Sequence, residues 1–469
     1  MSAATPHPGP DTGDAENRET AHPSHRAAPI APVDAALATA LAAHAAPDAR
    51  IAVALSGGID SMVLLDALHA VASRSALRLT ALHVDHGLSP HAGRWTEFCA
   101  AQCAARGVPL VICRVDVARR PGQSLEAAAR AARYRALFAA DADVVALAHH
   151  ADDQAETILL QLLRGAGPPG LAAMPRHRPR RDGRTALLRP LLDLPRATLA
   201  AYARARGLAW VDDESNADSR HKRNLLRLAV APLLAAGFPG YPLVLLRAAA
   251  HQAEAAALLD ELAAQDAAGA IGARFGAEGI DGARLAALTP PRARNLLRWF
   301  LRREGLRPPS TARLAAMLAQ LCAAAPDART RIVHDGVEIG RYRGRIVVHA
   351  AGAEPFVRAW HGEGSVPLPG GTLLFERTRG AGVAAAKLEA APVTLRSRGG
   401  GERIQLAANR PRRAVKKLLY DAGLPTWQRQ ALPFVWCGDE LAALPGIGVA
   451  LAFRARDGED SWRIEWRPG

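Results

Sequence analysis

Residues 56–61 read SGGIDS and follow the apolar run IAVAL, so two glycines and two serines surround one aspartate after an expected strand. Glycine lets a backbone approach a ligand closely, and the N–H groups that open a following helix attract anions. A plain turn would need neither the glycine pair nor Ser56 and Ser61. Asp60 brings negative charge to such a site, which makes sense for a Mg²⁺ ligand; a helix cap is the alternative. The segment predicts a phosphate site that is neither a Walker loop nor a GxGxxG turn, because both spacings are absent.

Two acids, Asp153 and Glu156, stand three residues apart in HHADDQAET (149–157). That spacing puts them on one face of an expected helix. They could complement the helix dipole, or they could form a cage for Mg²⁺ or for an ammonium group. His149 and His150 suggest zinc, but no third and fourth ligands follow at a suitable spacing.

Basic side chains accompany these acids. Arg130 and Arg133 share a face of the expected helix 126–137 and could stabilise developing phosphate charge; solvated arginines are the alternative. Asn224 and Arg227 lie at the end of DDESNADSRHKRNLLR, where they could bind a carboxylate or an RNA backbone. A helix start with charged caps would give the same pattern.

The elements that must position these residues alternate between apolar strands and helical stretches. Short runs rich in β-branched residues occupy 51–55, 78–84, 108–116 and 144–150. Their nearly continuous apolar character is typical of strands that are covered on both faces. The alternation predicts a doubly wound parallel α/β sheet, in which ligands bind beyond the carboxyl ends of the strands.

The rest of the chain changes character. Residues 245–325 are rich in Ala and Leu and predict helices, whereas 331–350 predict short strands. A stretch rich in Gly and Pro at 361–371 precedes a last part with mixed α and β patterns. We predict four parts: a disordered extension (1–32), an α/β catalytic domain (33–235), a mostly helical substrate-binding domain (236–355) and a small α+β C-terminal domain (385–469).

Composition narrows the class of protein. The 469 residues carry a formal net charge of +14, which favours a polyanionic partner, although a bias towards arginine could inflate the charge. The sequence contains no apolar run of 18 residues, so we expect no membrane span. Five cysteines without a CxxC pair predict a reduced, cytoplasmic protein.

SGGIDS matches the SGGxDS signature of the PP-loop, or N-type, ATP pyrophosphatases, which cleave ATP between its α- and β-phosphates. With HVDHGL (83–88), EAAARAARYRAL (126–137), AHHADDQAETILLQLLRG (148–165) and the segment 212–227, in this order, the chain resembles the tRNA(Ile)-lysidine synthases. The resemblance is strong over residues 50–235 and weaker from there to about residue 350. Residues 396–436 also resemble the C-terminal module of the family. One departure is Asp85, where many members have Asn.

The resemblance implies ATP-dependent ligation of free L-lysine to C2 of the wobble cytidine, position 34, of tRNA(Ile) with a CAU anticodon. The reaction passes through an adenylated cytidine, releases AMP and pyrophosphate, and changes codon reading from AUG to AUA. A basic middle domain would contact the anticodon side and the C-terminal domain the acceptor stem; a homodimer stays open.

Roles for individual residues follow from the motifs and from the resemblance together. ATP is assigned to Ser56, Gly57, Gly58, Ile59, Asp60, Ser61 and His83, with Mg²⁺ on Asp60. Catalysis is assigned to Asp60, Arg130, Arg133, Asp153 and Glu156. Lysine and tRNA are assigned to Asp153, Glu156, Asn224, Arg227, Arg412, Arg413, Lys416 and Lys417.

Three alternatives make different demands. Another PP-loop tRNA-modifying enzyme, such as a thiolase, would need a reactive cysteine or a CxxC pair. A phosphohydrolase built on HVDH and HHADD would need a transition metal and no lysine. A non-enzymatic RNA-binding protein would leave the phosphate turn without a use.

Overall fold

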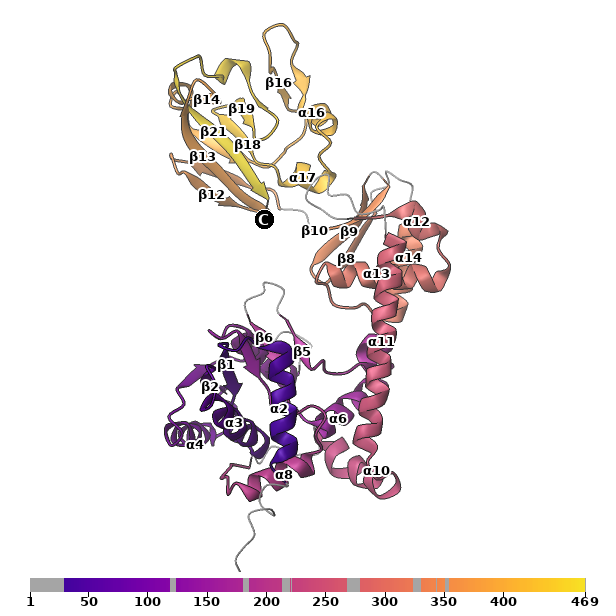
Figure 1. The fold of residues 1–469 in the computed structure, drawn as a ribbon. Helices are drawn as coiled ribbons and strands as arrows, with labels where there is room; N and C mark the ends of the chain where they lie inside the picture. Colours follow the sequence, from indigo (N-terminus) through magenta and orange to yellow (C-terminus); the bar gives the residue numbers. More distant parts are fainter. Residues whose placement is uncertain are drawn as a thin grey trace, which may run out of the picture. The chain divides into compact units, whose positions relative to one another are not determined.

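The structure, a computed structural model, describes residues 29–118, 124–179, 185–212, 220, 222–267, 279–323, 330–342, 344–350 and 354–468. It divides into two compact units, Met1–Ala257 and Leu258–Gly469 (Figure 1). The predicted extension, 1–32, lies outside the described residues except for 29–32, where helix α2 begins at Ala31. Within the described ranges no single helix is long and apolar enough to cross a membrane. One pair of helices, Lys222–Gly237 and Tyr241–Ala267, reaches that length and apolar composition only when taken together, and the pair is bent by 97°.

A six-stranded sheet with the order β3-β2-β1-β4-β6-β5 organises the first unit. Its strands are parallel except β5, which is antiparallel to β6. The predicted strands are confirmed, but the fourth ends at Ala146, four residues before His150, whose side chain caps the next helix. The strands are β1 (Arg50–Ala54), β2 (Arg78–Asp85), β3 (Leu110–Arg114), β4 (Val144–Ala146), β5 (His177–Arg178) and β6 (Ala186–Leu188).

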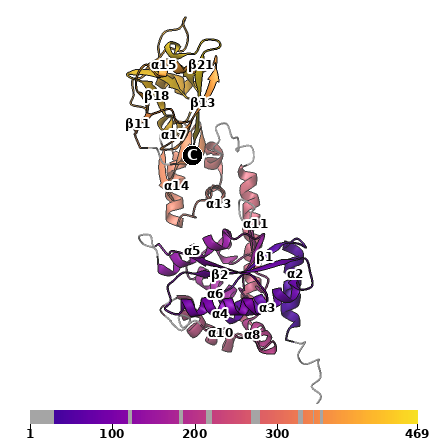
Figure 2. The same cartoon turned by 90° about the vertical axis from the view of Figure 1, so that its left-hand side faces the viewer.

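Helices cover both faces of this sheet (Figure 2). Ile51 and Val53 of β1 pack into a core with residues of α2, α3, α4 and α8, whereas Ala52 between them joins a second core under α5. This alternation follows from the two-residue period of a strand and confirms the doubly wound architecture. The helices are α2 (Ala31–His44), α3 (Ile59–Ala72), α4 (Ala92–Ala104), α5 (Leu125–Phe138), α6 (Ala151–Leu162), α7 (Pro168–Leu171), α8 (Arg196–Ala205), α9 (Lys222–Leu225), the π-helical η2 (Leu226–Val230) and α10 (Ala231–Gly237).

The winding reverses at β1. From β1 the chain continues to β2 and β3 on one side, and then returns to add β4 and β6 on the other side. The loops after β1 and β4 therefore diverge at the carboxyl edge of the sheet, where ligands of such folds bind. The SGGIDS turn follows β1, and the HHADD segment follows β4.

The second unit begins within α11 (Tyr241–Ala267). A four-stranded antiparallel sheet, β7-β10-β9-β8, packs with helices around a core that includes Phe300, Met317 and Ile339. The helices predicted at 245–325 and the strands predicted at 331–350 are confirmed. The elements are β7 (Gly279–Asp281), α12 (Gly282–Ala287), α13 (Pro290–Arg303), α14 (Thr311–Ala323), β8 (Arg331–His334), β9 (Val337–Tyr342) and β10 (Arg345–Ala350).

The C-terminal part of this unit contains two larger antiparallel sheets, β11-β15-β18-β19-β20 and β12-β13-β21-β14. Its core includes Val366 and Phe375, upstream of the predicted start at 385, and that boundary stays a prediction. We predicted a mixed α+β domain, and the structure contains both kinds of element but mostly strands. Its elements are β11 (Val357–Trp360), β12 (Ser365–Leu368), β13 (Gly371–Arg379), β14 (Val383–Ala384), α15 (Ala385–Leu388), β15 (Val393–Arg396), β16 (Arg403–Ile404), β17 (Arg413–Ala414), α16 (Val415–Asp421), α17 (Thr426–Ala431), β18 (Phe434–Cys437), β19 (Glu440–Leu444), β20 (Gly448–Val449), the 3₁₀ turn η3 (Leu451–Phe453) and β21 (Asp460–Pro468).

Candidate active site

The backbone conformation and the neighbouring side chains both require glycine at position 57. Its φ of +86° lies in the left-handed region, where a side chain is strained. A Cβ at this position would lie 2.9 Å from Val211 Cγ2 and 3.3 Å from Cys99 Sγ. The Gly57 carbonyl also accepts a hydrogen bond of 3.0 Å from the Val211 N–H. Only glycine satisfies all of these conditions.

Gly58 has a different reason to be glycine. Its φ is −73°, and a Cβ there would meet only Ser56 Oγ at 3.7 Å and the Val211 carbonyl oxygen at 3.9 Å. The protein itself therefore leaves room for a side chain. Gly58 precedes the first turn of α3, and no side chain caps that helix. The Gly58 N–H lies 3.4 Å from Ser56 Oγ, and the missing Cβ leaves open space beside the first turn of α3, where an anion could approach.

Serine hydroxyls hold the turn in shape. Ser61 Oγ donates to the Gly58 carbonyl oxygen at 2.9 Å and accepts from the Ser56 N–H at 3.2 Å. Ser56 Oγ lies 3.2 Å from Ser61 Oγ. Ser61 is buried while Ser56 is exposed, so Ser56 is the hydroxyl of the pair that a ligand can reach.

Asp60 lies in the first turn of α3, and its two carboxylate oxygens differ. Oδ2 lies 3.6 Å from His150 Nε2, whereas Oδ1 is buried without a hydrogen-bond partner. A buried carboxylate oxygen without a partner is rare and fits coordination of a cation. Among the residues that the structure describes, no group of three or more His, Cys, Asp or Glu side chains is arranged to hold a metal ion. Asp60 would therefore need oxygen ligands from a substrate, as Mg²⁺ sites with phosphates commonly have.

His150 connects the turn after β1 to the acids of α6. Its Nε2 lies 3.5 Å from Asp153 Oδ2, and its Nδ1 lies 3.6 Å from Asp152 Oδ2. Burial would lower the pKa of His150, but Asp152, Asp60 and Asp153 outweigh it and raise the pKa to about 10. Carboxylates of α3 and α6 therefore surround this buried ring, and its Nδ1 also lies 3.4 Å from the Asp153 N–H, which it caps at the start of α6.

The predicted acid pair is already matched by two arginines. Arg223 donates from Nε to Glu156 at 2.6 Å and from Nη2 to Asp153 at 2.9 Å. Arg227 donates from Nε to Glu156 at 2.7 Å and from Nη2 to Asp153 at 3.3 Å. These four side chains, here called the acid–arginine network, carry no net charge. Burial would raise the pKa of Asp153, but His150 and Arg223 hold it below its usual value.

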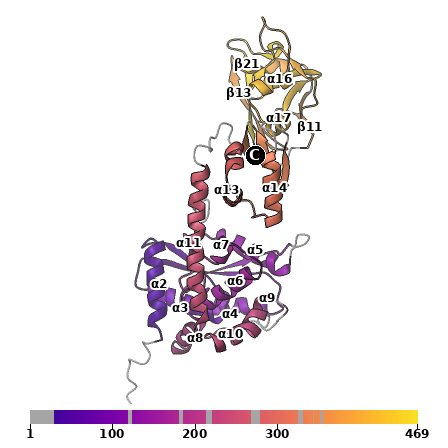
Figure 3. The ribbon, with the colours of Figure 1, turned by 90° about the vertical axis from the view of Figure 1, so that its right-hand side faces the viewer.

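Sequence reasoning gave Arg223 no role. Arg223 and Arg227 lie one helical turn apart on α9 and η2, and α9 lies beside α6 (Figure 3). Spacings of three and of four residues each place two side chains on one face of a helix. The spacing of Arg223 and Arg227 was therefore a signal in the sequence that both could face the two acids. Asn224 is half-buried in α9 between the two arginines. Its assignment to a substrate stays a prediction.

The arginines of α5 differ from those of the network. Arg130 donates from Nη2 to Tyr134 Oη at 3.3 Å, and its guanidinium lies 5.0 Å from the centre of the Tyr134 ring. No hydrogen bond or ion pair joins Arg133 to another described residue, and both arginines are exposed. Both are therefore open to an anionic ligand.

His83 is buried beneath the turn, and both of its ring nitrogens contact the protein. Nδ1 lies 2.9 Å from the Leu55 carbonyl oxygen, and Nε2 lies 3.1 Å from Thr96 Oγ1. His83 thus fixes the end of β1 against α4, and its assignment to ATP stays a prediction. Asp85 accepts from the Gly87 N–H at 2.9 Å, within its own turn.

The remaining predicted tRNA residues lie in the second unit. Arg412, Lys416 and Lys417 are exposed. Arg413 pairs with Asp421 at 2.5 Å, so part of its charge is already neutralised.

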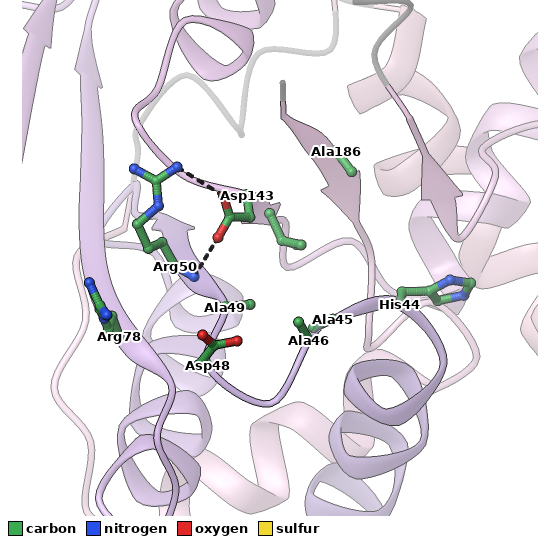
Figure 4. Close-up of a pocket in the computed structure, with 10 residues that line it drawn as sticks. His44, Ala45, Ala46, Asp48, Ala49, Arg50, Arg78, Asp143 and Ala186 are labelled. Carbon is green, nitrogen blue, oxygen red and sulfur yellow. Dashed lines mark hydrogen bonds and ion pairs between the residues drawn. The ribbon is translucent and has the colours of Figure 1, made fainter. Parts of the chain in front are cut away.

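A separate pocket of about 310 Å³ lies at the opposite, amino edge of the first sheet (Figure 4). Two of its lining residues are joined, because Arg50 donates from its backbone N–H and from Nη2 to Asp143, both at 2.9 Å. Because ligands of doubly wound sheets bind at the carboxyl edge, this pocket is not the candidate active site.

Comparison with known proteins covers most of the chain. A model of the PP-loop domain matches residues 32–234, one of the TilS substrate binding domain matches 281–347, and one of the TilS substrate C-terminal domain matches 393–466. The tRNA(Ile)-lysidine synthase of Nitrosomonas europaea is 43% identical over 435 residues, 91% of this chain and 94% of the relative. That of Ralstonia nicotianae is 44% identical over 442 residues, 89% of this chain and 92% of the relative. Among solved structures, a U34-tRNA thiolase from Methanococcus maripaludis gives a TM-score of 0.41 at 17% identity, covering 48% of this chain and 80% of that one. With three family models in order and such identity over nine-tenths of its length, the chain belongs to the tRNA(Ile)-lysidine synthase family.

Proposed function

We propose that this chain ligates free lysine to C2 of the wobble cytidine of tRNA(Ile) with a CAU anticodon, with conversion of ATP to AMP and pyrophosphate. The observation that carries the proposal is the link from the open turn at Gly58, through Asp60 and His150, to the acid–arginine network. A phosphate site and a site for an amino acid would thus lie side by side at one edge of the sheet.

The turn would serve the first half of the reaction. The C2 carbonyl oxygen of cytosine is a poor leaving group, and transfer of AMP to it makes AMP the group that departs. N–H groups at the start of α3 and the Ser56 hydroxyl would hold the phosphates of ATP. Asp60, whose Oδ1 lacks a partner, would hold Mg²⁺ together with phosphate oxygens, and the ion would neutralise the charge of departing pyrophosphate. Exposed Arg130 and Arg133 would stabilise charge that develops on the transferred phosphate.

The acid–arginine network would serve the second half. Free lysine carries one carboxylate and two ammonium groups. Arg223 and Arg227 complement the carboxylate, while Asp153 and Glu156 complement an ammonium group. In the absence of lysine these side chains neutralise each other, which keeps buried charges paired. Lysine would enter by exchanging these pairs for its own, and its amine would then attack C2.

The tRNA would contact the basic surfaces of both units. The net charge of +14 and the exposed Arg412, Lys416 and Lys417 support binding of a long polyanion. We place the protein in the cytoplasm, because ATP, lysine and tRNA meet there. A homodimer stays a prediction.

The thiolase alternative is not favoured. The curated relatives are tRNA(Ile)-lysidine synthases. Cys99 and Cys103 are buried, and burial raises the pKa of Cys99 to about 12, so neither is a ready nucleophile. Sulfur transfer needs a reactive thiol, whereas amine addition does not.

The proposal is tested with the full chain, CAU-anticodon tRNA(Ile), ATP, Mg²⁺ and lysine. We expect a mass gain of about 128 Da on the cytidine, from addition of lysine with loss of water by nucleophilic attack. Without lysine, we expect release of pyrophosphate and retention of AMP on the tRNA. A gain of about 16 Da with a sulfur donor, from replacement of oxygen by sulfur after the same activation, would instead identify a thiolase. An unmodified tRNA would refute the proposal.

A further inference from the structure

Arg189 lies at the carboxyl edge of the sheet, directly after β6. Leu188 of β6 pairs with Ala146 of β4, which in turn pairs with Val53 of β1. Arg189 is therefore two strands away from the phosphate turn, about 10 Å across the sheet. Its side chain is only 2% exposed and is among the largest fully buried side chains of the protein.

The buried guanidinium of Arg189 has no acidic partner among the described residues. Nη1 donates to the Pro175 carbonyl oxygen at 2.6 Å, and Nη2 lies 3.5 Å from Tyr134 Oη. Its Nε is buried without any hydrogen bond. A buried cation without a counter-charge is costly, so the site favours arrival of an anion.

Two further arginines surround the same aromatic residues. Arg130 shares Tyr134 Oη with Arg189, and Arg178 lies 5.6 Å from the centre of the Phe138 ring. Burial and the nearby charges of Arg178 and Arg130 lower the pKa of Arg189. No carboxylate in the described part of the chain pairs with any of the three. This contrasts with Arg223 and Arg227, which are matched by acids.

The positive charge of these arginines also affects the pKa of Tyr134. Burial alone would raise the pKa of its hydroxyl, but Arg130, Arg189 and Arg133 outweigh burial and lower it. Among the described residues, no carboxylate is hydrogen-bonded to this phenol or paired with Arg130 or Arg189. Guanidinium groups recognise phosphate with paired N–H donors, so phosphate is the anion that this cluster fits.

We propose that Arg178 binds one phosphate of the RNA strand beside the reacting cytidine, while Arg189 acts as a positioning residue behind Tyr134. Arg178 is exposed and can touch the phosphate. Arg189 adds charge from a buried position, where a field is weakly screened, and it shares the Tyr134 hydroxyl with Arg130, which serves the transferred phosphate. The inference rests on the proposed function, and it assigns this anion to RNA because the phosphates of ATP belong at α3, two strands away.

Binding of tRNA to the full chain, without ATP, tests the inference across a range of KCl concentrations. We expect Arg178→Gln and Arg189→Gln to weaken binding about tenfold and to reduce the log–log salt slope by about one. The KM for ATP in lysidine formation should stay within about twofold for Arg178→Gln, since a phosphate contact to RNA leaves ATP binding alone. Arg74→Gln is the matched control, because Arg74 is exposed without an ion pair among the described residues at the other end of α3.

A neutral methylphosphonate, placed at single linkages of the anticodon loop, locates the contact. At one linkage beside the cytidine it should weaken wild-type binding by the same factor and leave the Arg178→Gln variant unaffected. Additive losses at every linkage, an unchanged salt slope, or a raised KM for ATP in place of weaker RNA binding would each overturn the inference. Arg178 is exposed, so its variant decides the matter even where Arg189→Gln fails to fold. Wild-type protein that forms no lysidine would refute the proposed function itself.

Discussion

The carbonyl oxygen of Gly57 accepts a hydrogen bond from the N–H of Val211 at 3.0 Å, so the phosphate turn is tied to a segment from the other end of the first unit. The Val211 side chain also occupies the space where a Cβ of Gly57 would lie. The two glycines of SGGIDS are therefore glycines for different reasons. Gly57 is required by the fold, whereas we propose that Gly58 is required by the ligand.

Gly57→Ala should destabilise the protein. The new Cβ would lie 2.9 Å from Val211 Cγ2, and the residue would keep a φ of +86°. Strain and overpacking together should lower the free energy of unfolding by about 2 kcal/mol. Chemical denaturation monitored by circular dichroism measures the change. A variant as stable as the wild type would show that the turn is not packed against Val211.

Gly58→Ala should do the opposite. Its Cβ meets no atom closer than 3.7 Å, so the free energy of unfolding should stay within about 0.5 kcal/mol of the wild type. The methyl group would instead occupy the approach to the N–H groups of α3. We expect ATP to bind at least about tenfold more weakly by calorimetry, since close backbone approach is lost. Unaltered ATP affinity would place the nucleotide elsewhere.

Asp60→Asn should separate adenylation from RNA binding. The amide keeps the size of the carboxylate but cannot hold a divalent cation as well. Pyrophosphate release should fall by at least about 100-fold, as expected for loss of charge stabilisation in the transition state. Filter binding should give a Kd for tRNA within about twofold of the wild type. Equal loss in both measurements would argue against the site.

The stability of the protein at low pH should depend on the ionisation of Asp153. Its pKa is held below the usual value in the folded state, so its contribution is present at neutral pH and is lost as pH falls through the folded pKa. Unfolding free energy should therefore decrease from about pH 5 downwards, and Asp153→Asn should flatten that decrease. Asp116→Asn, at an exposed acid without an ion pair among the described residues, is the control. Identical pH profiles for Asp153→Asn and the wild type would contradict the network.

Two lysines of α16 should contribute to tRNA binding. Lys416→Gln with Lys417→Gln removes two exposed charges and should make the log–log salt slope shallower by about two. Lys387→Gln on α15 is the matched control, because Lys387 donates to the Arg454 carbonyl oxygen at 3.3 Å. An unchanged slope would identify the α16 lysines as a solvated surface.

Much of the first unit could be predicted from the sequence, because apolar runs and glycine turns are local signals. The strands at 51–55 and 78–84 and the turn at SGGIDS needed no knowledge of distant residues. The fourth strand was predicted too long because its apolar pattern continues into the His149–His150 turn. Periodicity does not distinguish the end of a strand from an apolar loop.

The partners in the site were harder to predict, because they depend on topology. Arg223 bonds to Asp153 and Glu156 only because α9 is brought beside α6. Arg189 has an ordinary position in LLRPLL, and its burial follows from the place of β6 in the sheet. An arginine directly after an apolar strand was the available signal for it.

The acid–arginine network also sets the minimal piece of this chain that can be prepared alone. A fragment ending at Asp212 would keep every strand of the first sheet, yet it would leave the buried carboxylates of Asp153 and Glu156 without their cations. Removing one side of a buried ion pair typically costs about 3–5 kcal/mol. Truncated or grafted forms of the first sheet and its helices should therefore retain the polypeptide through Val230.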